Sequence, residues 1–410
     1  MECRRGLVAF AIAGLAGLPP TTFAGSRKIV PCNPPASPPS ISVSLPSHPF
    51  DVVTSRDGCS IFVSMIGDDE KASGVAVVQR TARHVGLSRV IPLPPQPVGM
   101  AITNDGKLLI VANGPSVAFL DVDRMISGTE NALLGSVTIG PTAISFNVAI
   151  TADDKLLFVS DEANRAISVI NLDRARTDGF RGKATLGEIP VGQLPIALVL
   201  SPDERWLYTT SEEALPEWNW PKACRSERNE QGQTTLEHPE GAVVVVDVRR
   251  ARIDPSHSVR TRVPAGCSPV RMAMAPKGRQ IYVTARNSNA VLAFDTKKLV
   301  ADSGHARIGA LPTGVQPVPV AVIRGGKQVV VGNSRRSAAT SDTNGTLTVF
   351  DATKFRDGDH AVIGAVRAGV FPRGMSLSKG GKTLFVTNFG SKSLLLLDTT
   401  HLQVESASTK

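Results

Sequence analysis

Short apolar runs of about six residues alternate with small polar turns along most of the chain. The run "LFVTN" at 384–388, a polar turn and "SLLLLD" at 393–398 form one such pair. Similar pairs occupy 280–296, 156–173, 108–123 and 328–352, and looser versions occupy 60–80 and 206–248. Their equivalent residues are 48, 48, 50, 74, 48 and 55 positions apart: Phe62, Ile110, Phe158, Tyr208, Tyr282, Val330 and Phe385. Insertions in the turn account for the two wide gaps, so we interpret the pattern as seven repeats with a period of 48.

A second pattern precedes each pair. It consists of an apolar run that follows a proline and ends in a tight turn, as in "QPVGMAITNDGK" at 96–107, and the copy at 145–155 lacks the proline. Asp-Gly and Gly-Gly between apolar runs are strong hairpin signals, because both residues tolerate positive φ. A fourth short run, such as "GEIPVG", completes the unit. Each repeat therefore predicts four antiparallel strands.

Seven four-stranded repeats of this length predict an all-β fold, a seven-bladed β-propeller. An unclosed β-solenoid and a β-sandwich are the alternatives. The chain ends on the third strand of the last repeat, while residues 40–50, "SISVSLPSHPF", supply an unmatched fourth-strand pattern at the other end. We expect this N-terminal strand to complete the last blade and close the ring, because closure removes exposed sheet edges.

The phrases "LFVTN" at 384–388 and "IYVT" at 281–284 resemble the YVTN-repeat, YncE-like family of seven-bladed propellers, a group related to the bacterial lactonase-type propellers. The resemblance covers roughly residues 40 to 400. It implies the propeller fold and a binding or scaffold function, and the family includes members that bind single-stranded DNA.

The N-terminus predicts export. Residues 1–24 combine a basic start, a twelve-residue apolar run and a small-residue cleavage site ending at Ala24, which is typical of a signal peptide. Residues 25–40 are a Pro-rich lead-in, 41–401 the propeller and 402–410 a C-terminal tail. No segment approaches the roughly 20 apolar residues of a transmembrane span. We therefore expect a secreted or periplasmic protein, and a monomer.

Four cysteines remain after the predicted cleavage: Cys32, Cys59, Cys224 and Cys267. An even number in an oxidising compartment suggests disulfide bonds, and three connectivities are open. We favour Cys224–Cys267, because Cys224 lies in the long insertion of the fourth repeat and Cys267 directly before the fifth, with Cys32–Cys59 as the second bond. Free, buried cysteines are the alternative.

The formal net charge is +9. A basic surface favours a small anionic ligand or a polyanion, including single-stranded nucleic acid, although plain solubility explains the charge equally well, and a protein partner is a further option. No Gly-x-Ser-x-Gly, His-Glu-x-x-His, P-loop, dinucleotide-binding or haem-attachment motif is present. We therefore expect no cofactor and no metal. Asp121, Asp247, Asp295, Asp351 and Asp398 recur at the ends of third strands, and we interpret them as capping or turn residues.

Candidate binding residues are those that break the repeat. Two positions after the inner-strand proline most repeats carry a small residue, but three carry Asp51, Asn147 and Arg271. Arg373 departs from the apolar consensus one position earlier, and His48 precedes the proline of the first repeat. Two arginines beside an aspartate and a histidine suit a carboxylate or phosphate. The alternative is a water-filled channel whose charges pair with one another.

The longest insertion, at 211–242, holds Trp218 and Trp220. Tryptophans in such a loop either stack on a ligand at the channel mouth or pack as a local core. Two functions are open. The resemblance to YncE-like propellers implies an exported binding or scaffold protein, with a ligand site at the channel mouth. The related lactonase-type propellers imply the alternative, a hydrolase of a lactone or similar cyclic ester. In the hydrolase the His, Asp and Arg side chains would position water and stabilise the oxyanion.

Overall fold

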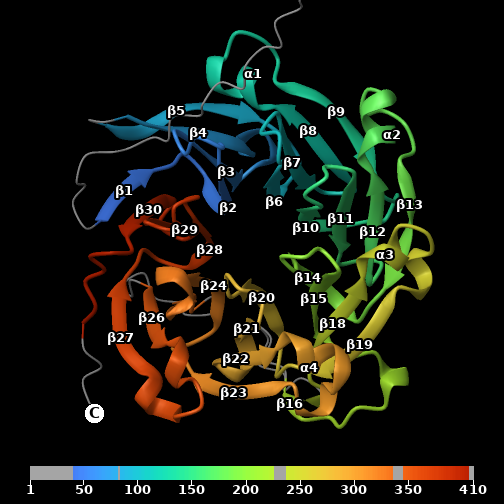
Figure 1. Ribbon diagram of the computed structural model, residues 1–410. Coiled ribbons are helices and arrows are strands. Elements are labelled where there is room, and N and C mark those ends of the chain that lie inside the picture. The colour runs from blue at the N-terminus through green and yellow to red at the C-terminus, as the bar shows by residue number, and fades with distance from the viewer. Residues whose placement is uncertain (1–39, 82–83, 226–236, 336–344, 406–410) are drawn as a thin grey trace, which may run out of the picture. The chain divides into compact units, whose positions relative to one another are not determined.

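The computed structural model describes residues 40–81, 84–225, 237–335 and 345–405. The chain divides into two compact units, 1–30 and 31–410, and the described residues belong to the second. In this unit seven four-stranded antiparallel sheets surround a central axis (Figure 1). The seven-bladed propeller predicted from the repeat is thereby confirmed. The predicted signal peptide lies outside the described residues.

Each blade runs from an inner strand at the axis to an outer strand at the rim. The strands of blade 1 are β2 (His48–Thr54), β3 (Ser60–Ile66), β4 (Gly74–Arg80) and β5 (Val85–Pro92). Blade 2 has β6 (Pro97–Ile102), β7 (Leu108–Asn113), β8 (Ser116–Asp121) and β9 (Leu133–Thr138). Blade 3 has β10 (Ser145–Ile150), β11 (Leu156–Asp161), β12 (Ala166–Asn171) and β13 (Thr185–Pro190). Blade 4 has β14 (Gln193–Leu200), β15 (Trp206–Glu213), β18 (Ala242–Asp247) and β19 (Val259–Pro264).

The remaining blades follow the same order. Blade 5 has β20 (Pro269–Met274), β21 (Gln280–Ala285), β22 (Ala290–Asp295) and β23 (Arg307–Pro312). Blade 6 has β24 (Pro317–Ile323), β25 (Gln328–Asn333), β26 (Thr346–Asp351) and β27 (Val362–Arg367). Blade 7 has β28 (Pro372–Leu377), β29 (Thr383–Asn388), β30 (Ser393–Asp398) and β1 (Ser40–Ser44). The insertion of blade 4 adds the two-residue strands β16 (Cys224–Arg225) and β17 (Glu237–His238).

The N-terminal strand closes the ring as predicted. β1 pairs antiparallel with β30, from Ser40 opposite Leu397 to Ser44 opposite Ser393. The sheet order β1-β30-β29-β28 therefore combines the two ends of the described chain in one blade. β1 covers the outer edge of β30, and the chain then continues into β2, so blade 7 is connected directly to blade 1.

Central strands are apolar without alternation because both of their faces are buried between blades. In β7, Leu109 and Val111 pack toward blade 1 in a cluster with Phe62. Ile110 packs in the opposite direction, in a cluster that includes Leu157 of blade 3. The core is thus a series of inter-blade layers, and each blade depends on its neighbours for burial.

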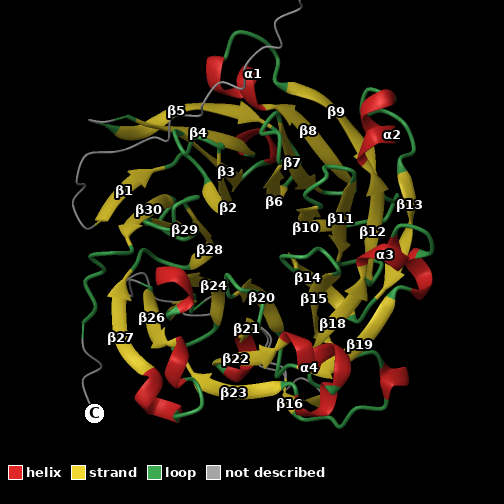
Figure 2. Ribbon diagram, in the orientation of Figure 1, coloured by secondary structure: helices red, strands yellow, loops and turns green. Residues whose placement is uncertain are grey.

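Inner and third strands run in the same direction, so the turns after both lie on one face of the ring. Four short helices follow third strands there: α1 (Val122–Ser127), α2 (Leu172–Thr177), α3 (Val248–Ala251) and α4 (Thr296–Ala301) (Figure 2). We call this the helix face. Recurrent aspartates cap α1, α3 and α4, whereas Asn171 caps α2, and Asp121, for example, accepts a hydrogen bond from the Arg124 amide. Asp247, Asp295, Asp351 and Asp398 accept equivalent bonds, which confirms that the recurrent aspartates are capping or turn residues, with Asp398 in a turn that no helix follows.

Hydroxyl groups of second strands join adjacent blades near the axis. Thr387 Oγ1 accepts a hydrogen bond from the Gly374 amide at 2.8 Å and donates one to the Phe50 carbonyl of blade 1 at 3.0 Å. Ser64, Ser160 and Thr284 donate in the same way to the next inner strand. Blade 6 has Gly332 at this position, and the residue opposite, Pro319, has no amide N–H to donate. These hydrogen bonds therefore join the inner strands of blades 1 and 2, 3 and 4, 5 and 6, and 7 and 1.

Candidate functional site at the channel mouth

All seven inner strands contain a register shift directly after the repeat proline, or after Ser145 in blade 3, which lacks the proline. Such a bulge re-aims side chains, and here it lets two successive residues of one strand project toward the axis. In blade 7 these two residues are Arg373 and Gly374, and in blade 5 they are Val270 and Arg271. This local irregularity is why both predicted arginines reach the channel from different repeat positions.

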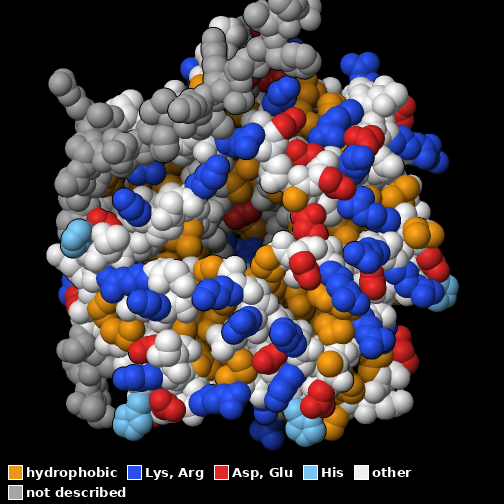
Figure 3. Space-filling view, in the orientation of Figure 1, with side chains coloured by type: hydrophobic (Ala, Val, Ile, Leu, Met, Phe, Trp, Pro, Cys, Tyr) orange, Lys and Arg blue, Asp and Glu red, His pale blue; other side chains and the backbone are white. Residues whose placement is uncertain are grey.

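Two cavities follow one another along the axis. The mouth cavity, about 140 Å³, lies at the end where inner strands begin, and five charged side chains line it together with four apolar ones: Glu162, Glu212, Arg271, Arg286 and Arg373 with Phe146, Ile196, Val270 and Val318. The channel cavity, about 240 Å³, lies nearer the helix face, and Asp51, Asn147 and Arg271 line it. Figure 3 views the helix face and shows the opening of the channel as a central hollow with charged side chains at its depth.

Arg271 lines both cavities and reaches across the axis from blade 5. Its guanidinium carbon lies 5.1 Å from the ring centre of Phe146 and 5.8 Å from that of Phe50, on blades 3 and 1. Burial lowers the pKa of Arg271, and the charges of Asp51 and Glu162 oppose this effect. Because an arginine pKa lies so far above neutrality, the side chain stays a cation that separates the two cavities.

Asp51 and Asn147 occupy equivalent positions and face the channel cavity. Asp51 accepts hydrogen bonds from the amides of Val52 at 2.9 Å and Met100 at 2.8 Å, so its carboxylate links blades 1 and 2. Burial raises the pKa of Asp51, while the Met100 amide and Arg271 act to lower it. Asn147 accepts from the Val148 amide at 2.9 Å. Both side chains therefore support the inner strands as well as line the channel.

Arg373 lies at the mouth, over aromatic rings of blades 1 and 7. Its guanidinium carbon is 4.4 Å from the ring centre of Phe50 and 5.5 Å from that of Phe371. Cations over aromatic faces are attracted by the ring quadrupole, so the two phenylalanines hold the guanidinium in place. Asp51, Arg271 and Arg373 are thus brought to the same axis, as predicted from their positions in the repeats.

Sequence reasoning missed three charged residues of the mouth cavity. Glu162, Glu212 and Arg286 each follow the last repeat residue of a second strand, in blades 3, 4 and 5. Arg286 donates to Glu212 at 2.7 Å, and both side chains are largely buried. The equivalent residues in the other blades are uncharged: Ile66, Gly114, Ser334 and Phe389. These three charged residues could have been predicted from the repeat, because they differ from the uncharged residues at the same position in the other blades.

Glu162 differs from its neighbours because its carboxyl group forms no hydrogen bond or ion pair with another described residue. Burial, and then the charge of Glu212, raise the pKa of Glu162 from 4.5 to about 7, although Arg271, Arg373 and Arg286 oppose the shift. A carboxyl group that titrates near neutrality in a cavity is a candidate functional group.

His48 lies on the rim and lines neither cavity. Its Nδ1 lies 2.8 Å from the Phe389 carbonyl oxygen, and its Nε2 lies 2.9 Å from Asp68 Oδ1. The imidazole also stacks on the Phe389 ring at 4.7 Å. Lys392 lies 2.9 Å from Asp68, and together with His48 it lowers the pKa of that carboxyl group. The histidine therefore joins blades 1 and 7 and is separate from the arginine cluster.

Trp218 and Trp220 pack on each other, with ring centres 5.3 Å apart, and against the apolar core of blades 3 and 4. Arg262 covers Trp218 at 5.0 Å. Neither indole lines a channel cavity. The same insertion is tied to the loop before β20 by the Cys224–Cys267 disulfide, which confirms the favoured pairing. The second predicted pairing involves Cys32, which lies outside the described residues.

No helix in the described part of the chain is long and apolar enough to cross a membrane. No group of three or more His, Cys, Asp or Glu side chains in the same part is placed to hold a metal ion.

Comparison with known proteins identifies the fold alone. No family model and no curated protein sequence matches the chain. Among solved structures the chain is similar to one titled Kuenenia stuttgartiensis Hydrazine Synthase, with a TM-score of 0.64 and 19% sequence identity. The match covers 88% of this chain and 97% of that one. The chain is therefore a β-propeller with a structural relative in hydrazine synthase, at an identity that indicates shared architecture.

Proposed function

We propose that the protein is an exported binding protein and that its mouth cavity binds a small organic anion. The observation that carries the proposal is the charge of the cavity, where three arginines face two glutamates. Glu212 is neutralised by Arg286, and Glu162 titrates near neutrality. The lining of the cavity therefore has more arginines than ionised carboxylates below about pH 7, and guanidinium groups suit carboxylates.

The size and the walls of the cavity support a particular kind of anion. A cavity of about 150 Å³ holds a six-carbon ring in another protein, and this one measures about 140 Å³. Phe146, Ile196, Val270 and Val318 form an apolar wall opposite the charged side chains. A short-chain or monocyclic carboxylate would place its carbon skeleton against this wall and its charge beside Arg373.

The proposal is tested by calorimetry with short carboxylates, sugar acids and their uncharged amides, using wild type and Arg373→Gln. We expect a carboxylate to bind and its amide not to bind, with affinity lowered at least about tenfold in the variant, since a charge-assisted hydrogen bond contributes about 1.5–3 kcal/mol. Arg367→Gln is the matched control, because Arg367 is exposed on β27 and pairs with Glu405. Equal binding by all three proteins would remove the mouth cavity from consideration.

Glu162 gives the binding a pH dependence. Below pH 7 its neutral carboxyl group can donate a hydrogen bond to the ligand, whereas above pH 7 its negative charge repels an anion. We therefore expect carboxylate affinity to fall as the pH rises through about 7, and Glu162→Gln should remove this dependence.

The raised pKa of Glu162 also favours a second candidate function, hydrolysis of a lactone or similar cyclic ester. In its ionised form Glu162 would act as a general base on water, and Arg373 would stabilise the oxyanion. His48, which the sequence suggested for this role, lies outside both cavities. Hydrolysis assays with a panel of lactones distinguish the two functions. For a hydrolase, turnover must rise with pH through about 7 and disappear in Glu162→Gln, whereas a binding protein gives no turnover.

Export is proposed from the N-terminal sequence, and the Cys224–Cys267 bond supports it because disulfides persist in oxidising compartments. We propose a monomer in a periplasmic or extracellular location. Light scattering of the purified protein tests its oligomeric state.

A further inference from the structure

The turns between inner and second strands divide the helix face into two halves. In blades 5, 6 and 7 these turns read "PKGR", "RGGK" and "KGGK", with two basic residues each and no acidic residue. We call their six side chains the basic arc: Lys277, Arg279, Arg324, Lys327, Lys379 and Lys382. All six are exposed. In Figure 3 basic side chains gather along the lower side of the central hollow, over β20 to β28.

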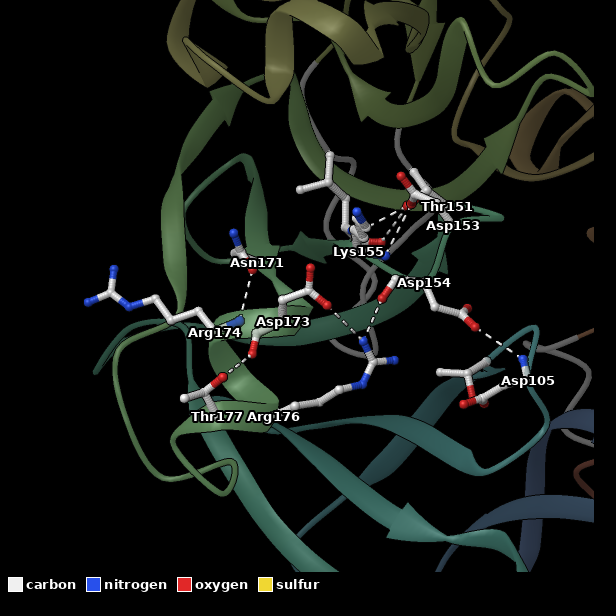
Figure 4. Close-up of polar contacts among 12 residues, drawn as sticks. Asp105, Thr151, Asp153, Asp154, Lys155, Asn171, Asp173, Arg174, Arg176 and Thr177 are labelled. Carbon is white, nitrogen blue, oxygen red and sulfur yellow. Dashed lines mark hydrogen bonds and ion pairs between the residues drawn. The ribbon is translucent and has the colours of Figure 1, made fainter. Parts of the chain in front are cut away.

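Equivalent turns in blades 1 to 4 each carry at least one carboxylate, and in blades 2 to 4 these groups hold the fold together. Asp154 of blade 3 accepts hydrogen bonds from the amides of Asn104 at 2.8 Å and Asp105 at 3.0 Å in blade 2 (Figure 4). Arg252 pairs with Asp153 at 3.0 Å. On this half acidic and basic turn residues are therefore mixed, and carboxylates bind groups of neighbouring blades.

The basic arc is not neutralised in this way by the described residues. None of its six side chains forms an ion pair with another described residue. The nearby aspartates at the ends of third strands, such as Asp295 and Asp351, cap the following segments and accept backbone hydrogen bonds. Arg324 is held in place by the carbonyls of Thr399 at 2.8 Å and Thr400 at 3.2 Å. A field of one sign thus borders half of the channel opening, the arrangement that attracts a polyanion.

The residues and the surface around the basic arc indicate which class of polyanion it binds. Single-strand nucleic-acid sites stack bases on aromatic side chains, and the aromatic residues of blades 5–7 nearest this face, including Phe294 and Phe355, are buried. A bilayer would approach as a plane and meet the helices around the rim, whereas the arc follows the inner border of a hollow. A flexible chain can follow that curve. We propose that the basic arc binds an acidic polysaccharide whose sugars carry carboxylate or sulfate groups.

The test compares two triple variants with equal net charge. Lys327→Gln, Lys379→Gln and Lys382→Gln remove half of the arc and leave Arg324 and its carbonyl contacts intact. The control, Lys107→Gln, Lys155→Gln and Lys183→Gln, removes three exposed lysines from blades 2 and 3. The probe is fluorescent polygalacturonate, titrated between 50 and 200 mM salt; a single-stranded oligonucleotide and vesicles rich in an anionic lipid are the comparison ligands.

We expect polygalacturonate to bind wild type and control with a steep salt dependence, because binding releases counterions. The arc variant should bind about tenfold more weakly, with a salt slope reduced by about half, since three of six contacts are lost. Equal losses in both triple variants would show a nonspecific effect of net charge and overturn the proposal. An arc-dependent preference for the oligonucleotide or the vesicles would overturn the polysaccharide as ligand. Arg373→Gln should leave polygalacturonate binding unchanged, because the mouth cavity lies at the other end of the channel.

Discussion

Glu162→Gln tests the electrostatics of the mouth cavity without any ligand. The pKa of Glu162 is raised from 4.5 to about 7 in the folded protein, while in the unfolded chain it should take its ordinary value. Below about pH 4.5 the carboxyl group is neutral in both states, and its contribution to stability is at its highest. As the pH rises from about 4.5 to about 7 only the unfolded state loses its proton, so stability falls until the folded state also ionises.

The size of this fall follows from the shift. One pKa unit corresponds to about 1.36 kcal/mol, so the raised pKa costs about 3 kcal/mol of unfolding free energy above pH 8. With an unfolding entropy near 2.1 cal/mol/K per residue, a propeller of about 370 residues would change its melting temperature by about 4 °C. Gln resembles the neutral carboxyl group, so the variant should match wild type at pH 5 and melt about 4 °C higher at pH 8.

Calorimetric melting at pH 5, 6, 7 and 8 measures this difference. Glu188→Gln is the control, because Glu188 is exposed on the outer strand β13. The control should keep the same offset from wild type at every pH. If Glu162→Gln also kept a constant offset, Glu162 would have an ordinary pKa, and both functions that rest on its near-neutral titration would lose their support.

Other predictions concern the ring, the insertion and the leader. Thr387→Val removes a hydroxyl that joins blades 7 and 1 and leaves a buried amide and carbonyl unpaired. The unfolding free energy should therefore fall by about 1–3 kcal/mol in denaturant titrations. Thr383→Val, at the start of the same strand, is the control and should change the unfolding free energy by less than about 0.5 kcal/mol. Replacing Cys224 and Cys267 with Ser opens a loop with a sequence separation of 43, which should cost about 4 kcal/mol by loop entropy; a melting temperature equal to wild type would contradict this. Amino-terminal sequencing of the exported protein should begin at residue 25, whereas an intact leader would argue against cleavage there.

The channel site was partly predictable because a repeat makes departures visible. Seven copies define what each position normally holds, and Asp51, Arg271 and Arg373 stood out against that background. Glu162 and Arg286 depart just as clearly, one position after a repeat residue that we treated as the end of the strand. They were missed because their role depends on how far the second strand reaches toward the mouth, which is a property of the folded blade.

His48 was expected at the arginine site from its position in the sequence but lies elsewhere in the structure. Its distance of three residues from Asp51 suggested a shared site. The bulge after Pro49 instead directs Asp51 to the axis, while His48 stacks on Phe389 of another blade. Neighbours in sequence therefore diverged because a contact 341 residues away in the chain decided the position of the imidazole.

The sequence by itself determined the architecture of this protein. The repeat period, the apolar runs and the turn residues specify the strands, and the unmatched N-terminal strand specifies how the ring closes, since all of these depend on local pattern. Only the tertiary structure decided which charges meet. Arg271 lies beside rings from blades 1 and 3, and the pKa of Glu162 is set by burial and by Glu212 on the next blade. The burial of these side chains and the charges around them depend on residues that are distant in the chain. They are therefore determined only when the seven blades have closed around one axis.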